Sequence, residues 1–245
     1  MMEGEVNVKG GWRLARKFVV AFGMLLVFGS CLGLAQKRDS RMEEIEWTWE
    51  VRPAHVDEKL PNVLLLGDSI TRAYFPEVQK GLAGAANVYL MATSASVGDP
   101  RLVGQIEEFS AAEGVAFGVV HFNNGMHGWE YSEAEYRAAF PAFLAEIRLI
   151  APKAALIWAT TTPVKQETEP GPTNARVVAR NAVADAAIRD SGMKPAIVTD
   201  DQYQLMVKHA ELYKDFVHFN DEGAALQGKQ AAESIRRVLG LAGGR

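Results

Sequence analysis

The sequence predicts an α/β sandwich on a parallel sheet, and two patterns support this. Five short apolar runs read as buried strands, and the segments between them carry the spacing of amphipathic helices. Strands that alternate with helices are typical of right-handed β-α-β units, so we expect five parallel strands between two helical layers. The expected strands cover about 62–66, 87–92, 116–122, 154–160 and 195–199, and the expected helices about 70–83, 101–113, 132–150, 174–190 and 221–239.

The first 35 residues have the pattern of a signal peptide. A basic cluster ends at Lys17, the stretch 18–35 carries no charge, and Gly33 and Ala35 occupy the −3 and −1 positions of a cut before Gln36. We therefore expect 1–35 to be removed and the protein to be exported to the periplasm or secreted.

Two other fates of this segment stay open. Eighteen apolar residues reach the lower end of a bilayer span, so an uncleaved membrane anchor is one alternative. Cys31 follows a partial lipobox, so a lipid anchor is the other. Apart from such an anchor we expect no membrane contact.

The rest of the chain divides into a lead-in and one domain. Residues 36–60 are polar and contain Trp47 and Trp49, which we expect to pack this lead-in onto the domain formed by 61–245. With 26 Lys and Arg against 30 Asp and Glu, the chain has no basic field for nucleic acid. A single cysteine excludes a disulfide framework and a cysteine-based zinc site.

The predicted site lies where the first three strands end. In a doubly wound sheet the ligand crevice lies outside the carboxyl ends of the strands, where the strand order reverses. With strand order 2-1-3-4-5, Ser69, Gly98 and Asn124 converge there. A hydroxyl nucleophile near hydrogen-bond donors suits acyl transfer.

Such a nucleophile needs a base, and His218 is the best of the five histidines. Asp215 precedes it by three residues and can orient the imidazole, while Asn220 can cap the last helix.

These residues together resemble the SGNH or GDSL hydrolase family across about residues 60–240. The resemblance implies a flavodoxin-like three-layer α/β/α sandwich with a five-stranded parallel sheet. It also implies a Ser69, His218 and Asp215 triad, with the oxyanion hole formed by the Ser69 amide, the Gly98 amide and the Asn124 side chain. The implied enzyme is a serine esterase without metal or cofactor, and its expected substrate is a small acyl ester or an acetylated glycan.

The third sequence block departs from the family pattern. The family has Gly-x-Asn-Asp, whereas this chain has Phe122-Asn123-Asn124-Gly125, which leaves Asn123 as a competing donor. His127 and Trp129 follow on the same loop and either contact a sugar or form a packed loop tip.

Several residues have structural explanations instead. His121 lies in a predicted strand and is expected to be a core histidine. Asp200 and Asp201 end the last strand as reserve carboxylates or helix caps. Gly98 can also serve a turn with positive φ before Pro100.

Three other functions remain to be tested. An α/β-hydrolase would use Ser96, since 94–98 nearly matches the Gly-x-Ser-x-Gly elbow. A non-enzymatic glycan-binding or envelope protein would keep Trp129 as an anchor and a silent triad. A metal-dependent hydrolase would draw on a further set whose spacing fits no ligand pattern: Asp68, Asp99, His127, Asp215 and His218.

Overall fold

The computed structural model describes residues 39–241, which belong to one compact unit beginning at Lys37. The predicted signal peptide and the alternative anchors, Cys31 included, fall on residues outside the described range. Within 39–241 no helix is both long enough and apolar enough to span a bilayer.

A six-stranded sheet forms the centre of this unit, with the order β1-β3-β2-β4-β5-β6. The last five strands are parallel and follow the predicted 2-1-3-4-5 order. The strands are β1 (Thr48–Val51), β2 (Asn62–Gly67), β3 (Asn87–Thr93), β4 (Phe117–Phe122), β5 (Ala155–Ala159) and β6 (Val198–Asp200).

The prediction of five strands is wrong by one. β1 lies in the lead-in and pairs antiparallel with β3, with Thr48 opposite Thr93 and Val51 opposite Leu90. It has only four residues, and three of them are exposed, so its sequence lacks the apolar run that marks the other strands.

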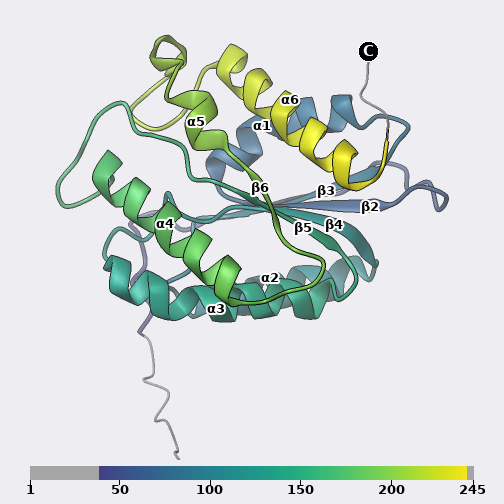
Figure 1. Ribbon diagram of the computed structural model, residues 1–245, viewed down its shortest axis with the longest axis horizontal. Coiled ribbons are helices and arrows are strands. Elements are labelled where there is room, and N and C mark those ends of the chain that lie inside the picture. Colours follow the sequence, from purple (N-terminus) through teal and green to yellow (C-terminus); the bar gives the residue numbers. More distant parts are fainter. Residues whose placement is uncertain (1–38, 242–245) are drawn as a thin grey trace, which may run out of the picture. The chain divides into compact units, whose positions relative to one another are not determined.

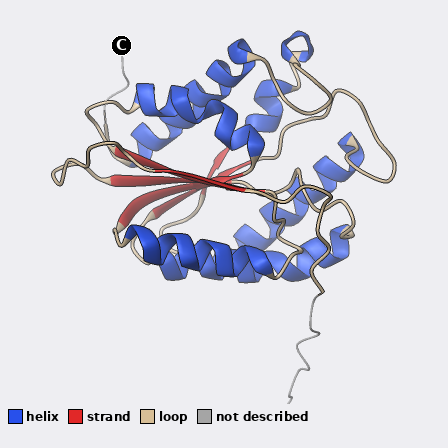
Figure 2. Ribbon diagram, turned by 180° about the vertical axis from the view of Figure 1, so that it is seen from behind, coloured by secondary structure: helices blue, strands red, loops and turns tan. Residues whose placement is uncertain are grey.

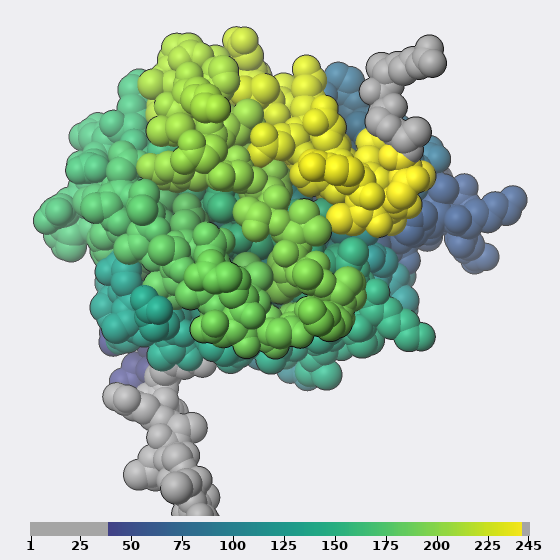
Figure 3. Space-filling view, viewed as in Figure 1, coloured from purple at the N-terminus to yellow at the C-terminus, as the bar shows by residue number. Residues whose placement is uncertain are grey.

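Helices cover both faces of the sheet, as Figures 1 and 2 show. α2, α3 and α4 pack on one face, and α1, α5 and α6 on the other. The face with α4, α5 and α6 toward the viewer consists largely of the C-terminal half of the chain (Figure 3). The helices are α1 (Ser69–Gly81), α2 (Arg101–Glu113), α3 (Glu133–Ile150), α4 (Asn174–Asp190), α5 (Gln202–Met206) and α6 (Asp221–Val238).

The core lies in two layers, one on each side of the sheet. Alternate residues of β2 enter different layers: Leu64 and Leu66 face the α2 and α3 side, while Val63 and Leu65 face the α1 and α6 side. All four are at most 1% exposed, as expected for a central strand buried on both faces. This rigid sheet fixes the loops at its carboxyl edge.

Candidate active site

Ser69 is the first residue of α1, directly after β2. The turn is tight: a Cβ on Gly67 would approach the Thr71 Oγ1 to 2.1 Å, so only glycine fits there. Asp68 caps the helix, because its Oδ1 accepts a 2.9 Å hydrogen bond from the Ile70 amide. Asp68 therefore supports the turn that presents the serine.

Asp215 and His218 share one short turn ahead of α6. Tyr213 and Phe219 close the turn through a β-bridge, and their rings stack with centroids 4.4 Å apart. Asn220 caps α6 by accepting a 3.0 Å bond from the Gly223 amide, as predicted. The turn and the helix cap together fix where the imidazole stands.

The structure brings Ser69, His218 and Asp215 into one hydrogen-bonded chain. Ser69 Oγ lies 2.7 Å from His218 Nε2, and His218 Nδ1 lies 2.9 Å from Asp215 Oδ2. Partial burial raises the pKa of the Asp215 carboxyl, but the amides of His218 and Val217 and the imidazole outweigh it and hold that pKa below its usual value. The carboxylate thus stays ionised and fixes the proton on Nδ1.

Asn124 connects the loop after β4 with the loop after β3. Its side-chain oxygen accepts a 2.8 Å bond from the Val97 amide, and its side-chain amide donates to the Ala95 oxygen at 2.9 Å. An amide group carries two N–H donors, so one remains for another acceptor. Asn124 is 3% exposed and braces the loop before Gly98.

Position 98 requires a glycine because the Tyr131 ring packs against its backbone. Its φ is not positive, so the proposed turn with positive φ is wrong. A Cβ at this position would lie 2.4 Å from the Tyr131 ring, which leaves room only for glycine.

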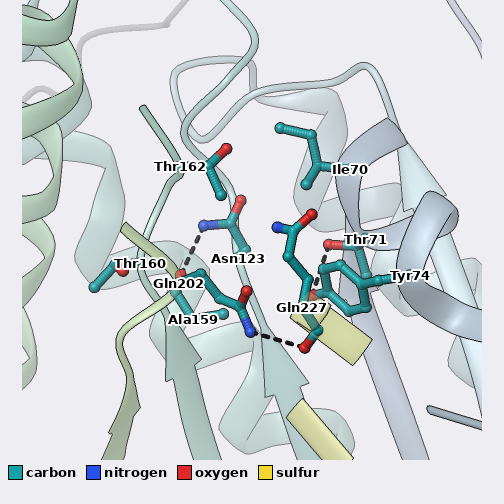
Figure 4. Close-up of a pocket in the computed structure, with 9 residues that line it drawn as sticks. All are labelled: Ile70, Thr71, Tyr74, Asn123, Ala159, Thr160, Thr162, Gln202 and Gln227. Carbon is teal, nitrogen blue, oxygen red and sulfur yellow. Dashed lines mark hydrogen bonds between the residues drawn. The ribbon is translucent and has the colours of Figure 1, made fainter. Parts of the chain in front are cut away.

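Asn123 points elsewhere. Its amide donates to the Ala159 oxygen at 2.7 Å and to Thr161 Oγ1 at 3.1 Å. Figure 4 shows its side chain in a separate pocket beside Thr162 and Gln202. This pocket holds about 10 Å³, room for about one water molecule and too little for a substrate.

The two other catalytic arrangements are not assembled. Ser96 Oγ is buried and makes no hydrogen bond within residues 39–241, so no base contacts it. Over the same residues no group of three His, Cys, Asp or Glu side chains forms a metal site. Asp99, one of the candidate ligands, is instead paired with Arg101 at 2.6 Å.

A buried arginine on α4, which was not among the predicted site residues, holds the loop that follows β4. The guanidinium of Arg180 is 1% exposed and donates to the backbone oxygens of Gly125, His127, Gly128 and Tyr131 at 2.7–3.2 Å. It also lies 3.9 Å from the centre of the Trp129 ring. Burial lowers the pKa of Arg180 to about 10.

The lead-in contributes a second carboxylate–imidazole pair. Glu43 Oε2 lies 2.9 Å from His127 Nδ1, and Glu43 Oε1 accepts a 3.0 Å bond from the Gly128 amide. Burial lowers the pKa of His127, but Glu43 and the nearby carboxylates of Asp68 and Glu46 outweigh it and raise that pKa.

The lead-in is tied down on both sides of this pair. Arg41 forms a 2.6 Å ion pair with Glu135, and the Trp47 and His127 rings make a T-shaped contact with centroids 5.8 Å apart. The Arg72 guanidinium lies 5.3 Å from the Trp47 ring and 5.0 Å from the Trp49 ring. The two tryptophans thus pack the lead-in on the domain, as predicted.

Ser69, His218, His127 and Glu43 open onto one cleft of about 320 Å³, whereas Gly98 and Asn124 are not among its lining residues. It is lined by the nucleophile candidate and its base, by the second histidine, and by aromatic and acidic residues: Ser69, His218, His127, Trp129, Phe216 and Glu43. No lysine or arginine is among the described residues that line it.

The remaining predicted residues lie away from the cleft. His121 is fully buried, and its Nε2 lies 2.8 Å from Asp200 Oδ2, so it is a core histidine. Asp200 also accepts bonds from Gln202 and Gln230, which use its carboxylate within the core. Asp201 caps α5 through a 3.0 Å bond from the Gln204 amide.

Comparison with solved structures identifies the fold. The structure is similar to a carbohydrate esterase family 3 protein from Talaromyces cellulolyticus, with TM-score 0.58 and 14% identity over 74% of this chain and 99% of the other. It is also similar to a GDSL-like lipase from Bacteroides thetaiotaomicron, with TM-score 0.58 and 17% identity over 76% and 93%.

A third similar structure is the catalytic domain of a peptidoglycan O-acetyltransferase from Streptococcus pneumoniae, with TM-score 0.52 and 19% identity over 74% and 96%. No family model matches the sequence, and no curated protein matches it. The chain therefore has the SGNH hydrolase fold, as the sequence resemblance implied.

Proposed function

We propose that the protein is an exported serine esterase of the SGNH type that removes small acyl groups, above all acetyl, from carbohydrate hydroxyls. The observation that carries this proposal is the chain from Ser69 Oγ to His218 Nε2 to Asp215, with distances of 2.7 and 2.9 Å, at a cleft of about 320 Å³. A hydroxyl, a base and an orienting carboxylate in this order are the parts that acyl transfer requires.

The proposed reaction proceeds in two steps. Ser69 Oγ attacks the ester carbonyl as His218 accepts its proton, and the imidazolium then gives that proton to the departing alcohol. Water next attacks the acyl-serine with His218 again as the base, which releases the carboxylic acid and the free serine. The amides of Ser69 and Gly98 and the free N–H of Asn124 are the proposed donors to the oxyanion.

The fold neighbours favour this class of substrate. A carbohydrate esterase and a peptidoglycan O-acetyltransferase on the same fold both handle acyl groups on sugars. Trp129 at the cleft offers an apolar ring for a sugar face, and its indole N–H is already used by the Met126 oxygen at 2.6 Å.

The test is hydrolysis of p-nitrophenyl esters from acetate to octanoate by the purified protein, with and without a chelator. We expect turnover of acetate that resists chelation and falls steeply beyond butyrate. Inertness toward all of these esters, together with binding to acetylated glycans, would instead indicate the silent glycan-binding protein. Loss of activity on chelation and its return with zinc would refute the serine mechanism.

A further inference from the structure

Two imidazole–carboxylate pairs face the same cleft, and the proposed reaction uses only one. His218 with Asp215 is the proposed base. His127 with Glu43 lines the cleft with it, and its distance from imidazole nitrogen to carboxylate, 2.9 Å, is the same as in the first pair.

The second pair is built so that one imidazole nitrogen stays available. Glu43 binds His127 Nδ1, and its other oxygen accepts from the neighbouring Gly128 amide, so the carboxylate that orients the ring is itself held by the loop. His127 Nε2 makes no hydrogen bond within residues 39–241, although the side chain is only 17% exposed. A fixed polar atom of this kind at a cleft is a ready contact for a ligand.

We propose that His127, positioned by Glu43, binds a hydroxyl group of the alcohol portion of the substrate and selects neutral sugars over acidic ones. This inference rests on the proposed esterase function. Because Nδ1 carries the proton shared with Glu43, Nε2 accepts a hydrogen bond when the ring is neutral and donates one when it is protonated. A hydroxyl can serve as partner in both states, whereas a carboxylate can serve only in the second.

The charges around the cleft oppose an acidic sugar. Glu43, Glu44 and Glu130 line it, and no lysine or arginine does so among the described residues. The buried guanidinium of Arg180, 3.9 Å from the centre of the Trp129 ring, is occupied by backbone oxygens. A sugar carboxylate would therefore meet three glutamates, with no lysine or arginine among the described lining residues to offset their charge.

The experiment compares three acetyl esters: p-nitrophenyl acetate, a mono-O-acetylated methyl glucoside and the corresponding methyl glucuronoside. The readout is the ratio of kcat/KM on each sugar to kcat/KM on p-nitrophenyl acetate. This ratio does not depend on the folded fraction of a variant, because the concentration of active enzyme cancels. We expect the wild-type ratio for the glucoside to exceed that for the glucuronoside by about 10-fold.

The variants separate binding from a merely structural role. His127→Ala should lower the glucoside ratio about 10-fold, mainly through KM, which corresponds to one hydrogen bond of about 1.4 kcal/mol. His127→Gln, which keeps a polar group near the Nε2 position, should restore most of the ratio. Glu43→Gln should lower it about 3-fold, because it removes the charge that orients the ring.

A second His–Glu pair supplies the control. His209 and Glu211 lie 3.1 Å apart on the exposed surface and do not line the cleft, so His209→Ala and Glu211→Gln should keep the wild-type ratios. A glucoside ratio within 2-fold of wild type in His127→Ala, or a wild-type preference for the glucuronoside, would overturn the inference. A wild-type protein inert toward all three esters would instead refute the proposed function.

Discussion

Replacing Arg180 with methionine tests whether one buried side chain holds the active-site loop. The guanidinium makes four hydrogen bonds to backbone oxygens between Gly125 and Tyr131. Bonds with a charged donor contribute about 1.5–3 kcal/mol each, or roughly 6–12 kcal/mol for the four. Methionine replaces the apolar stem of arginine but leaves all four oxygens without this donor.

A second effect opposes this loss. Burial lowers the pKa of Arg180 to about 10, so the fold bears a cost of about 3 kcal/mol for keeping the charge away from water, and methionine removes that cost. In the variant, water that reaches the loop will also donate hydrogen bonds to some of the four backbone oxygens. We therefore expect Arg180→Met to lower the free energy of unfolding by about 3–5 kcal/mol.

Urea denaturation followed by circular dichroism measures this difference. Arg180→Lys keeps a charge but lacks the planar fork, so it should fall between wild type and methionine. Arg189→Met is the matched control, because Arg189 is exposed in the last turn of the same helix and should change stability by less than about 0.5 kcal/mol. A loss below 1 kcal/mol in Arg180→Met would refute the reasoning that these four bonds outweigh the desolvation cost.

Three further predictions concern the proposed chemistry. Ser69→Ala and His218→Ala should each abolish most esterase turnover, and the double variant should lose little more, because the pair acts as a unit; additive losses in steady-state kinetics would contradict this. Asn124→Ala should reduce kcat about 100-fold and also destabilise the protein by about 1–3 kcal/mol, since it braces the 95–97 loop, while Asn123→Ala should spare kcat. The lowered pKa of Asp215 keeps that carboxylate ionised until the pH falls below the ordinary carboxyl range, so kcat/KM should show no inflection near pH 4; an inflection at that pH would show that Asp215 takes up a proton there.

The sheet could be predicted because burial on both faces leaves a strong signal. The five parallel strands have continuous apolar runs, and their helices have apolar spacing such as Phe140, Phe143 and Ile147 in α3. β1 left no such signal, because a short edge strand with exposed residues is held by its backbone pairing with β3. α5 has five residues, too few for a periodic pattern.

The site was predictable where local chemistry carries it. The Gly67-Asp68-Ser69 turn and the Asp215 and His218 pair each consist of residues that lie within three positions of one another in the sequence. Glu43 could not be found this way, since it joins His127 across 84 positions of sequence. Arg180 does have a signal in the sequence, because it lies on the buried face of α4, three residues from both Val177 and Val183.

Arg180 and Tyr136 are polar side chains buried beside the loop that follows β4, and the proposed reaction gives a reason for them. An oxyanion needs N–H donors, and a peptide oxygen turned toward it would repel it. Arg180 donates to four backbone oxygens of the loop, and the Tyr136 hydroxyl donates to the backbone oxygen of Asn124. Groups of the protein interior therefore bind these oxygens. In the proposed reaction, the N–H donors of this loop can therefore face the substrate without competition from the loop's own carbonyl oxygens. In this proposal, the free-energy cost of burying Arg180 is accepted because the peptide groups of the loop are already oriented before the substrate binds.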